Sequence, residues 1–85
     1  MEKYELTIVL DSKATSAKKK KVTETIEKIV ALAKGKLGKV EDWGVKESGL
    51  YLFFPLETPK SSVKMISTKV SQEESIKKYL LIRKN

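Results

Sequence analysis

The chain has 85 residues, with 18 basic against 11 acidic side chains, a formal net charge of +7, and neither cysteine nor histidine. Without those two residue types it lacks the usual near-neutral proton shuttle, the thiolate nucleophile and the preferred zinc ligands, so we expect no catalysis, metal or cofactor. The basic excess predicts a polyanionic partner, and nucleic acid is the commonest one.

The length predicts one domain over residues 1–85, because no linker divides the chain. No apolar stretch approaches the length of a membrane span, and we expect no signal peptide at the N-terminus. The absence of cysteine is consistent with a cytoplasmic protein.

The first third of the sequence predicts a strand followed by a helix. Residues 4–10 alternate large apolar side chains with Glu5 and Thr7, which is the period of a half-buried strand. Turn and N-cap residues between Asp11 and Ser16 then precede a long helix. Its apolar stripe recurs at helical spacing and is expected to face a sheet: Val22, Ile26, Ile29, Val30 and Ala33.

The middle of the chain predicts a hairpin. Gly35 and Gly38 are natural helix terminators, and residues 40–46 then form a second strand. Residues 47–49 form a tight turn into a third strand, residues 50–57. One side of this third strand is expected to be buried: Leu50, Leu52, Phe54 and Leu56.

The last third predicts a shorter helix and a final strand. Thr58 and Pro59 open the helix, whose apolar stripe is Val63, Ile66 and Val70. Residues 76–82 form the last strand, which is apolar on both faces and is therefore expected to be central or covered. The order βαββαβ predicts an α+β ferredoxin-like sandwich, with two helices on one face of a four-stranded antiparallel sheet.

The other face of this sheet is expected to be open and apolar, with Tyr51, Phe53 and Val9 on it. RNA-recognition modules stack unpaired bases on such a face, but they need aromatic residues where this chain has Glu5 and Thr7. We therefore interpret the open-face aromatics as packing or partner contacts.

Two groups of basic residues are candidates for binding a polyanion. The run Lys18–Lys21 points around a helix, so we interpret it as a mostly solvated face. Lys77, Lys78, Arg83 and Lys84 flank the last strand. Since the first and last strands are neighbours in this topology, we expect these charges to gather with Lys3 along one side; ordinary charged strand ends that guard a sheet edge are the alternative.

All but one of the basic residues are lysine, which favours recognition of phosphate and shape over the reading of base edges. The serines have no histidine to activate them, so the sequence does not predict an enzyme.

Three segments resemble the bacterial small-subunit ribosomal protein S6 family: residues 1–11, the sequence Glu41-Asp42-Trp43-Gly44, and residues 76–82. The resemblance covers nearly the whole chain in order. It implies a structural protein of the small ribosomal subunit in the cytoplasm, with no membrane association and no small-molecule substrate. The implied partners are the central domain of small-subunit ribosomal RNA and small-subunit ribosomal protein eighteen.

The resemblance and the charge pattern together suggest the site residues. For RNA binding they are Lys3, Tyr4, Lys46, Lys77, Lys78 and Arg83; for partner binding they are Trp43, Tyr51 and Phe53.

The chain departs from the family pattern in one place. Members of the family continue from Trp-Gly into a long hairpin, whereas residues 44–49 turn almost at once into the next strand. The alternative function is a protein-interaction or small-ligand regulatory module of the same fold, which the apolar open face would suit.

Overall fold

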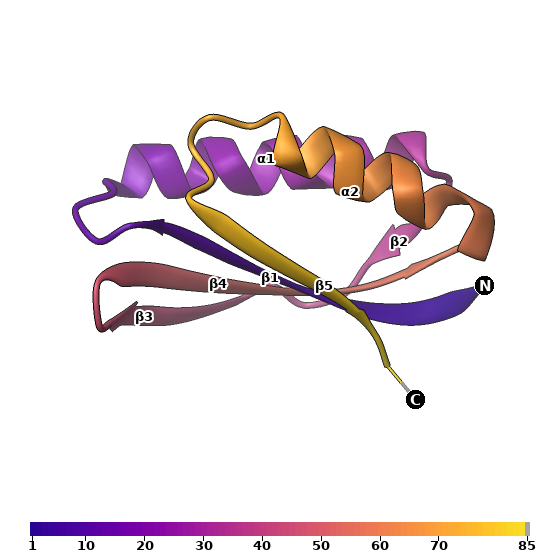
Figure 1. Cartoon of the computed structure of the whole chain (residues 1–85), viewed down its shortest axis with the longest axis horizontal. Coiled ribbons are helices and arrows are strands. Elements are labelled where there is room, and N and C mark those ends of the chain that lie inside the picture. The colour runs from indigo at the N-terminus through magenta and orange to yellow at the C-terminus, as the bar shows by residue number, and fades with distance from the viewer. Residues whose placement is uncertain (85) are drawn as a thin grey trace.

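The computed structural model describes residues 1–84 and places two helices on one face of an antiparallel sheet (Figure 1). The strands lie in the order β2-β4-β1-β5, and β3 pairs with the same side of β4 as β2 does. This is the predicted α+β ferredoxin-like sandwich. In chain order the elements are β1 (Glu2–Asp11), α1 (Ser16–Leu32), β2 (Lys36–Leu37), β3 (Glu41–Lys46), β4 (Gly49–Thr58), a 3-10 turn (Lys60–Ser62), α2 (Val63–Ser71) and β5 (Lys78–Arg83).

The two long central strands carry the core on alternate residues, as their period predicts. The buried side of β1 and β4 consists of Tyr4, Leu6, Ile8, Leu10, Leu50, Leu52, Phe54 and Leu56. The intervening residues of β1 from Glu5 to Val9, and of β4 from Tyr51 to Glu57, are half-buried and lie on the uncovered face. Each fully buried aliphatic side chain contributes about 1.5–3 kcal/mol to stability relative to an exposed one.

Both helices bury the predicted stripes against this side. Thr15 caps α1, its hydroxyl accepting a 3.1 Å hydrogen bond from the Lys18 N–H. The core includes Val22, Ile26, Ile29, Val30 and Ala33 from the first helical segment, and Ile66 and Val70 from the second; Val63 is half-buried against them.

The first helix ends before the glycines that the sequence suggested as terminators. Its C-cap is Ala33, and Lys34 takes the left-handed conformation, with φ 59°. The Lys34 N–H donates to the Ala31 carbonyl at 3.0 Å and the Gly35 N–H to the Val30 carbonyl at 2.9 Å. These two bonds form a Schellman motif, which satisfies carbonyls at the helix end.

The predicted second strand, residues 40–46, is present as β3 over residues 41–46, but a break around Gly38 separates it from an additional two-residue strand, β2, that the sequence did not predict. Leu37 pairs with Leu56 and Glu41 with Phe53, so the register shifts by one residue between them. Gly38 donates a 2.7 Å hydrogen bond to the Pro55 carbonyl. A Cβ on Gly38 would stand 3.1 Å from the Pro55 ring, so the close approach favours glycine. This break explains why the structure has five strands in four sheet positions.

The last strand is an edge strand, and the expectation of a central or covered position is wrong. Tyr79 and Leu81 pack partly against the core, whereas Leu80 and Ile82 are 58% and 46% exposed on the open face. The strand is apolar on both faces because one face adds to the core and the other to an uncovered surface.

Candidate nucleic-acid interface

The sheet face opposite the helices is uncovered (Figure 1) and carries an apolar surface. We call it the apolar band, and it extends over four neighbouring strand positions. Cross-strand pairing sets Tyr51 beside Val9 and Thr7 between Phe53 and Leu80, so these side chains share the face. The apolar band consists of Val9, Trp43, Tyr51, Phe53, Pro55, Leu80 and Ile82.

Trp43 lies at one edge of the apolar band because β3 is irregular there. The register shifts between Asp42 and Gly44, Gly44 has φ 76°, and the Gly44 N–H donates to the Asp42 carboxylate at 2.8 Å. The indole stacks on Phe53, with 4.9 Å between ring centroids and 12° between the ring planes.

Two polar side chains hold the indole in place. Its Nε1–H donates to Glu41 Oε1 at 3.0 Å, and the Lys46 Nζ stands 5.4 Å from the ring centroid. The ammonium is therefore within the range of a cation–π interaction. Trp43 remains 40% exposed, so the arrangement fixes an aromatic surface without covering it.

The expected basic residues lie at both ends of the apolar band. Lys78 is opposite Val9, at the end of the sheet where Lys46 and the β3–β4 turn also lie. Lys77, whose N–H donates to the Val9 carbonyl, is next to it and exposed. Lys3 lies six residues before Val9 on β1, which at strand rise is about 20 Å away. The expectation that Lys3 gathers with Lys77 and Lys78 is therefore not met.

Arg83 and Lys84 do reach the Lys3 end of the sheet, since Arg83 pairs with Tyr4 and the Lys84 N–H donates to the Lys3 carbonyl at 2.9 Å. The Arg83 guanidinium makes a 2.6 Å ion pair with Glu2. Tyr4, on the helix-covered side, donates a 2.9 Å hydrogen bond to the same carboxylate. Burial, followed by that hydrogen bond, raises the pKa of the Tyr4 phenol above its usual value.

The basic run on α1 is on the other side of the molecule from the apolar band. Lys19 makes a 3.0 Å ion pair with Asp42, which ties the helix to β3, while Lys18, Lys20 and Lys21 are exposed. The hydrogen bond from Lys19, followed by that from the Gly44 N–H, holds the pKa of the Asp42 carboxyl below its usual value. The run therefore offers solvated charge, with one member engaged.

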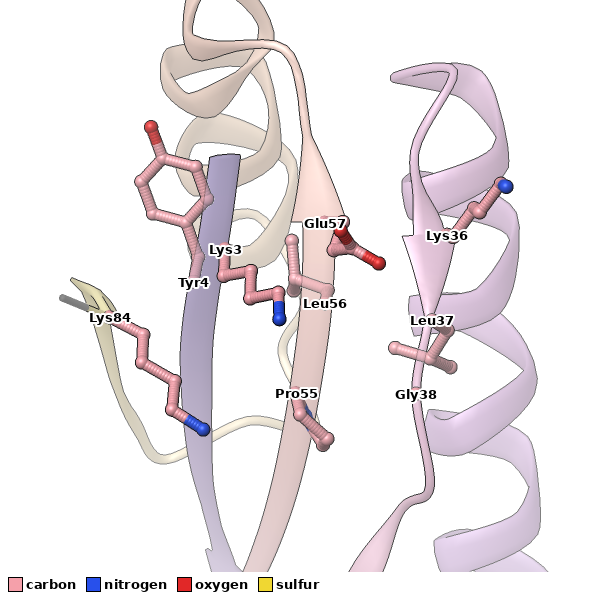
Figure 2. A pocket seen from close by; sticks show the side chains of 9 residues that line it. All are labelled: Lys3, Tyr4, Lys36, Leu37, Gly38, Pro55, Leu56, Glu57 and Lys84. Atoms are coloured by element: carbon pink, nitrogen blue, oxygen red, sulfur yellow. The ribbon is translucent and has the colours of Figure 1, made fainter. Parts of the chain in front are cut away.

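The break between β2 and β3 creates a feature that the sequence did not predict. A hollow of about 370 Å³ lies beside Pro55, where the chain turns away from β4 at Gly38 (Figure 2). Three lysines line it: Lys3, Lys36 and Lys84. Lys36 was not predicted because its position depends on the pairing of β2 with β4, which no local sequence pattern indicates.

Within residues 1–84, no group of three or more His, Cys, Asp or Glu side chains could hold a metal ion. None of the helices in this part of the chain is long and apolar enough to cross a membrane. What the face offers is an aromatic and aliphatic surface with ammonium groups at either end.

Comparisons of the sequence with known proteins agree on one family. The profile of the family described as "Ribosomal protein S6" matches residues 3–83. The chain is 25% identical to the small ribosomal subunit protein bS6 of Pelagibacter ubique, over 98% of this chain and 76% of the relative. It is 26% identical to the bS6 protein of Dehalococcoides mccartyi, over 93% of this chain and 81% of the relative.

Solved structures share the fold. The 30S ribosomal protein S6 of Thermotoga maritima superposes with a TM-score of 0.85 at 18% identity, covering 98% of this chain and 87% of that one. The C-terminal domain of the MgtC protein from Mycobacterium tuberculosis gives a TM-score of 0.77 at 8% identity, covering 99% and 88% of the two chains. At these identities the likeness establishes the architecture alone.

Proposed function

The chain belongs to the ribosomal protein S6 family, and from this premise we propose that it binds small-subunit ribosomal RNA, in the central domain, as a structural part of the small subunit. Membership makes it a small-subunit ribosomal protein, non-enzymatic and located in the cytoplasm with the ribosome. The contact with RNA is what we propose beyond family membership.

The observation that carries the proposal is the placement of lysines at both ends of the apolar band. Within residues 1–84 the ion pairs are those of Lys19 with Asp42 and of Arg83 with Glu2. Lys3, Lys46, Lys77 and Lys78 are exposed and take part in neither. A separation of about 20 Å spans several phosphates along one strand, so the two ends can hold one RNA segment at separate points.

The proposed RNA residues differ in where and how they would contribute. Lys46, Lys77 and Lys78 would contact phosphates at one end, and Lys3 at the other, where they fix position without reading sequence. Tyr4 is buried, so its contribution would be to anchor Glu2, and through it Arg83. The Arg83 side chain is 54% exposed, which leaves part of its guanidinium available to a phosphate.

The apolar band supports the proposed partner, small-subunit ribosomal protein eighteen. Trp43, Tyr51 and Phe53 form its aromatic part, and Leu80 and Ile82 extend it to the edge strand. Exposed apolar side chains that are contiguous and bordered by lysines mark a protein-binding surface. The β3–β4 connection here is only a short turn, so this surface, not a long hairpin, would supply the contact.

The RNA proposal is tested by the salt dependence of binding to a small-subunit ribosomal RNA fragment. Each phosphate contact adds about −0.7 to −0.9 to the slope of log affinity against log salt, so several contacts give a steep decline. A flat response, or no co-sedimentation with small subunits, would contradict it.

The same experiment separates the second candidate function, a protein-interaction or small-ligand regulatory module. The observation that favours it is the exposure of Leu80 and Ile82 beside the aromatic residues. An apolar protein interface responds weakly to salt, in contrast to a phosphate interface. Capture of a protein partner with unchanged affinity from low to high salt, and no binding of RNA, would favour this alternative.

A further inference from the structure

The hollow beside Pro55 is bordered by a row of charged side chains that crosses the whole sheet. Lys36 on β2 is paired opposite Glu57 on β4, Glu57 is opposite Lys3 on β1, and Lys84 follows β5 beside Lys3. Cross-strand partners project on the same face, so all four side chains lie on the open side of the sheet. The row carries three positive charges and one negative charge.

The ammonium groups of this row are not neutralised. Among residues 1–84, Lys3, Lys36 and Lys84 take part in no ion pair within 4.0 Å, although Glu57 stands between two of them. Figure 2 shows Lys3 and Lys84 on one side of Glu57 and Lys36 on the other. An anion placed in the hollow would relieve the repulsion between the lysines, and the Glu57 carboxylate would partly oppose it.

The size and the lining of the hollow indicate which class of anion it could bind. Its volume of about 370 Å³ exceeds what a bare phosphate fills and falls in the range of small-molecule sites. The Pro55 ring and Leu37 add apolar surface beside the lysines. Gly38 also lines the hollow, without a side chain.

We infer that this hollow is a binding site for one nucleotide unit, with the phosphate among Lys3, Lys36 and Lys84 and the sugar or base against Pro55. The inference deepens the proposed function, on which its RNA form rests, because it assigns Lys36 and Lys84 to the interface. The unit can be part of an RNA strand or a free nucleotide, since both present the same chemistry.

The test is a titration of the full chain followed by amide chemical shifts in NMR. Adenosine 5′-monophosphate is expected to shift the amides of Gly38 and Glu57, and adenosine, which lacks the phosphate, is not. Lys36→Gln and Lys84→Gln should each weaken binding by about two- to fivefold, the effect of one exposed ammonium. Glu57→Gln should strengthen it.

The matched control is Lys28→Gln, which removes the same charge from an exposed site on α1. Binding in this variant should stay at the wild-type level. If Lys28→Gln weakens binding as much as Lys36→Gln, or if the nucleotide shifts the Gly38 amide no more than adenosine does, the inference is wrong.

A hexauridylate RNA distinguishes the two sources. Displacement of adenosine monophosphate by the oligonucleotide supports a nucleotide unit of RNA, and nucleotide binding without displacement supports a free nucleotide. Ribosomal RNA binding without change at Gly38 and Glu57 would overturn the inference while leaving the proposed function intact. Nucleotide binding without ribosomal RNA binding would support the inference for a free nucleotide and contradict the proposed function.

Discussion

Lys34 has a backbone conformation that suits glycine better than lysine. With φ 59° it closes the Schellman motif at the end of α1, where the Cβ of an L-residue is crowded. We expect Lys34→Gly to raise the free energy of unfolding by about 1 kcal/mol. Urea denaturation measures this change.

The control for Lys34→Gly is the same substitution inside the helix. Lys28 is exposed within α1, so Lys28→Gly should lower stability by about 1 kcal/mol through helix propensity. If Lys34→Gly and Lys28→Gly both lowered stability, the backbone at Lys34 would not be strained.

Asp42 makes stability depend on pH through its contact with Lys19. Because the folded-state pKa of this carboxyl is below its usual value of 3.8, its contribution is present above that pH and is lost as the pH falls through the folded-state pKa. Asp42→Asn should therefore lower stability at pH 7, and this deficit should be smaller at pH 2. Urea unfolding of both proteins at the two pH values checks this; an equal deficit at both would assign the effect to packing.

At the scale of the strand, two adjacent residues of β4 lie on opposite faces of the sheet: Phe54 on the covered face and Phe53 on the open one. Phe54 is fully buried, so Phe54→Ala is expected to lower the free energy of unfolding by about 3–5 kcal/mol. Phe53 is half-buried and stacks on Trp43, so Phe53→Ala should cost about 1 kcal/mol, from the lost aromatic pair. Equal losses in the two variants, measured by urea unfolding, would contradict the assignment of faces.

The elements that the sequence predicted well are those whose pattern is local. Alternation in β1 and β4 and the stripes of α1 and α2 depend only on which side of one element is buried. The break at Gly38 escaped prediction because a glycine after a helix also serves as a terminator, and its packing on Pro55 is a tertiary contact.

The position of β5 escaped prediction for a related reason. A run such as Tyr79 to Ile82 is typical of a covered strand, but here one side packs on the core and the other joins the apolar band. The candidate site shows the same limit. Which lysines share an end of the sheet depends on register. For this reason Lys36 was missed, and Lys3 was grouped correctly with Arg83 and Lys84 but wrongly with Lys77 and Lys78, about 20 Å away.

At the scale of the molecule, the positive charge has two parts with different surroundings. One part lies on the outer surface of α1, where Lys20 and Lys28 are exposed. The other borders the apolar band, where lysines at both ends flank the surface that aromatic residues occupy. Net charge attracts RNA to both, but the second part also offers shape and a partner surface, which is why we assign binding to it.

The most direct test of this assignment compares two double variants on the same small-subunit ribosomal RNA fragment, with folding checked by circular dichroism. Lys77→Ala with Lys78→Ala should weaken binding and reduce the salt slope by about 0.7–0.9 for each lost phosphate contact. Lys20→Ala with Lys28→Ala removes the same charge from α1 and should leave the slope nearly unchanged. A larger loss of affinity in the α1 variant would contradict the account, because the RNA would then lie on the helical layer.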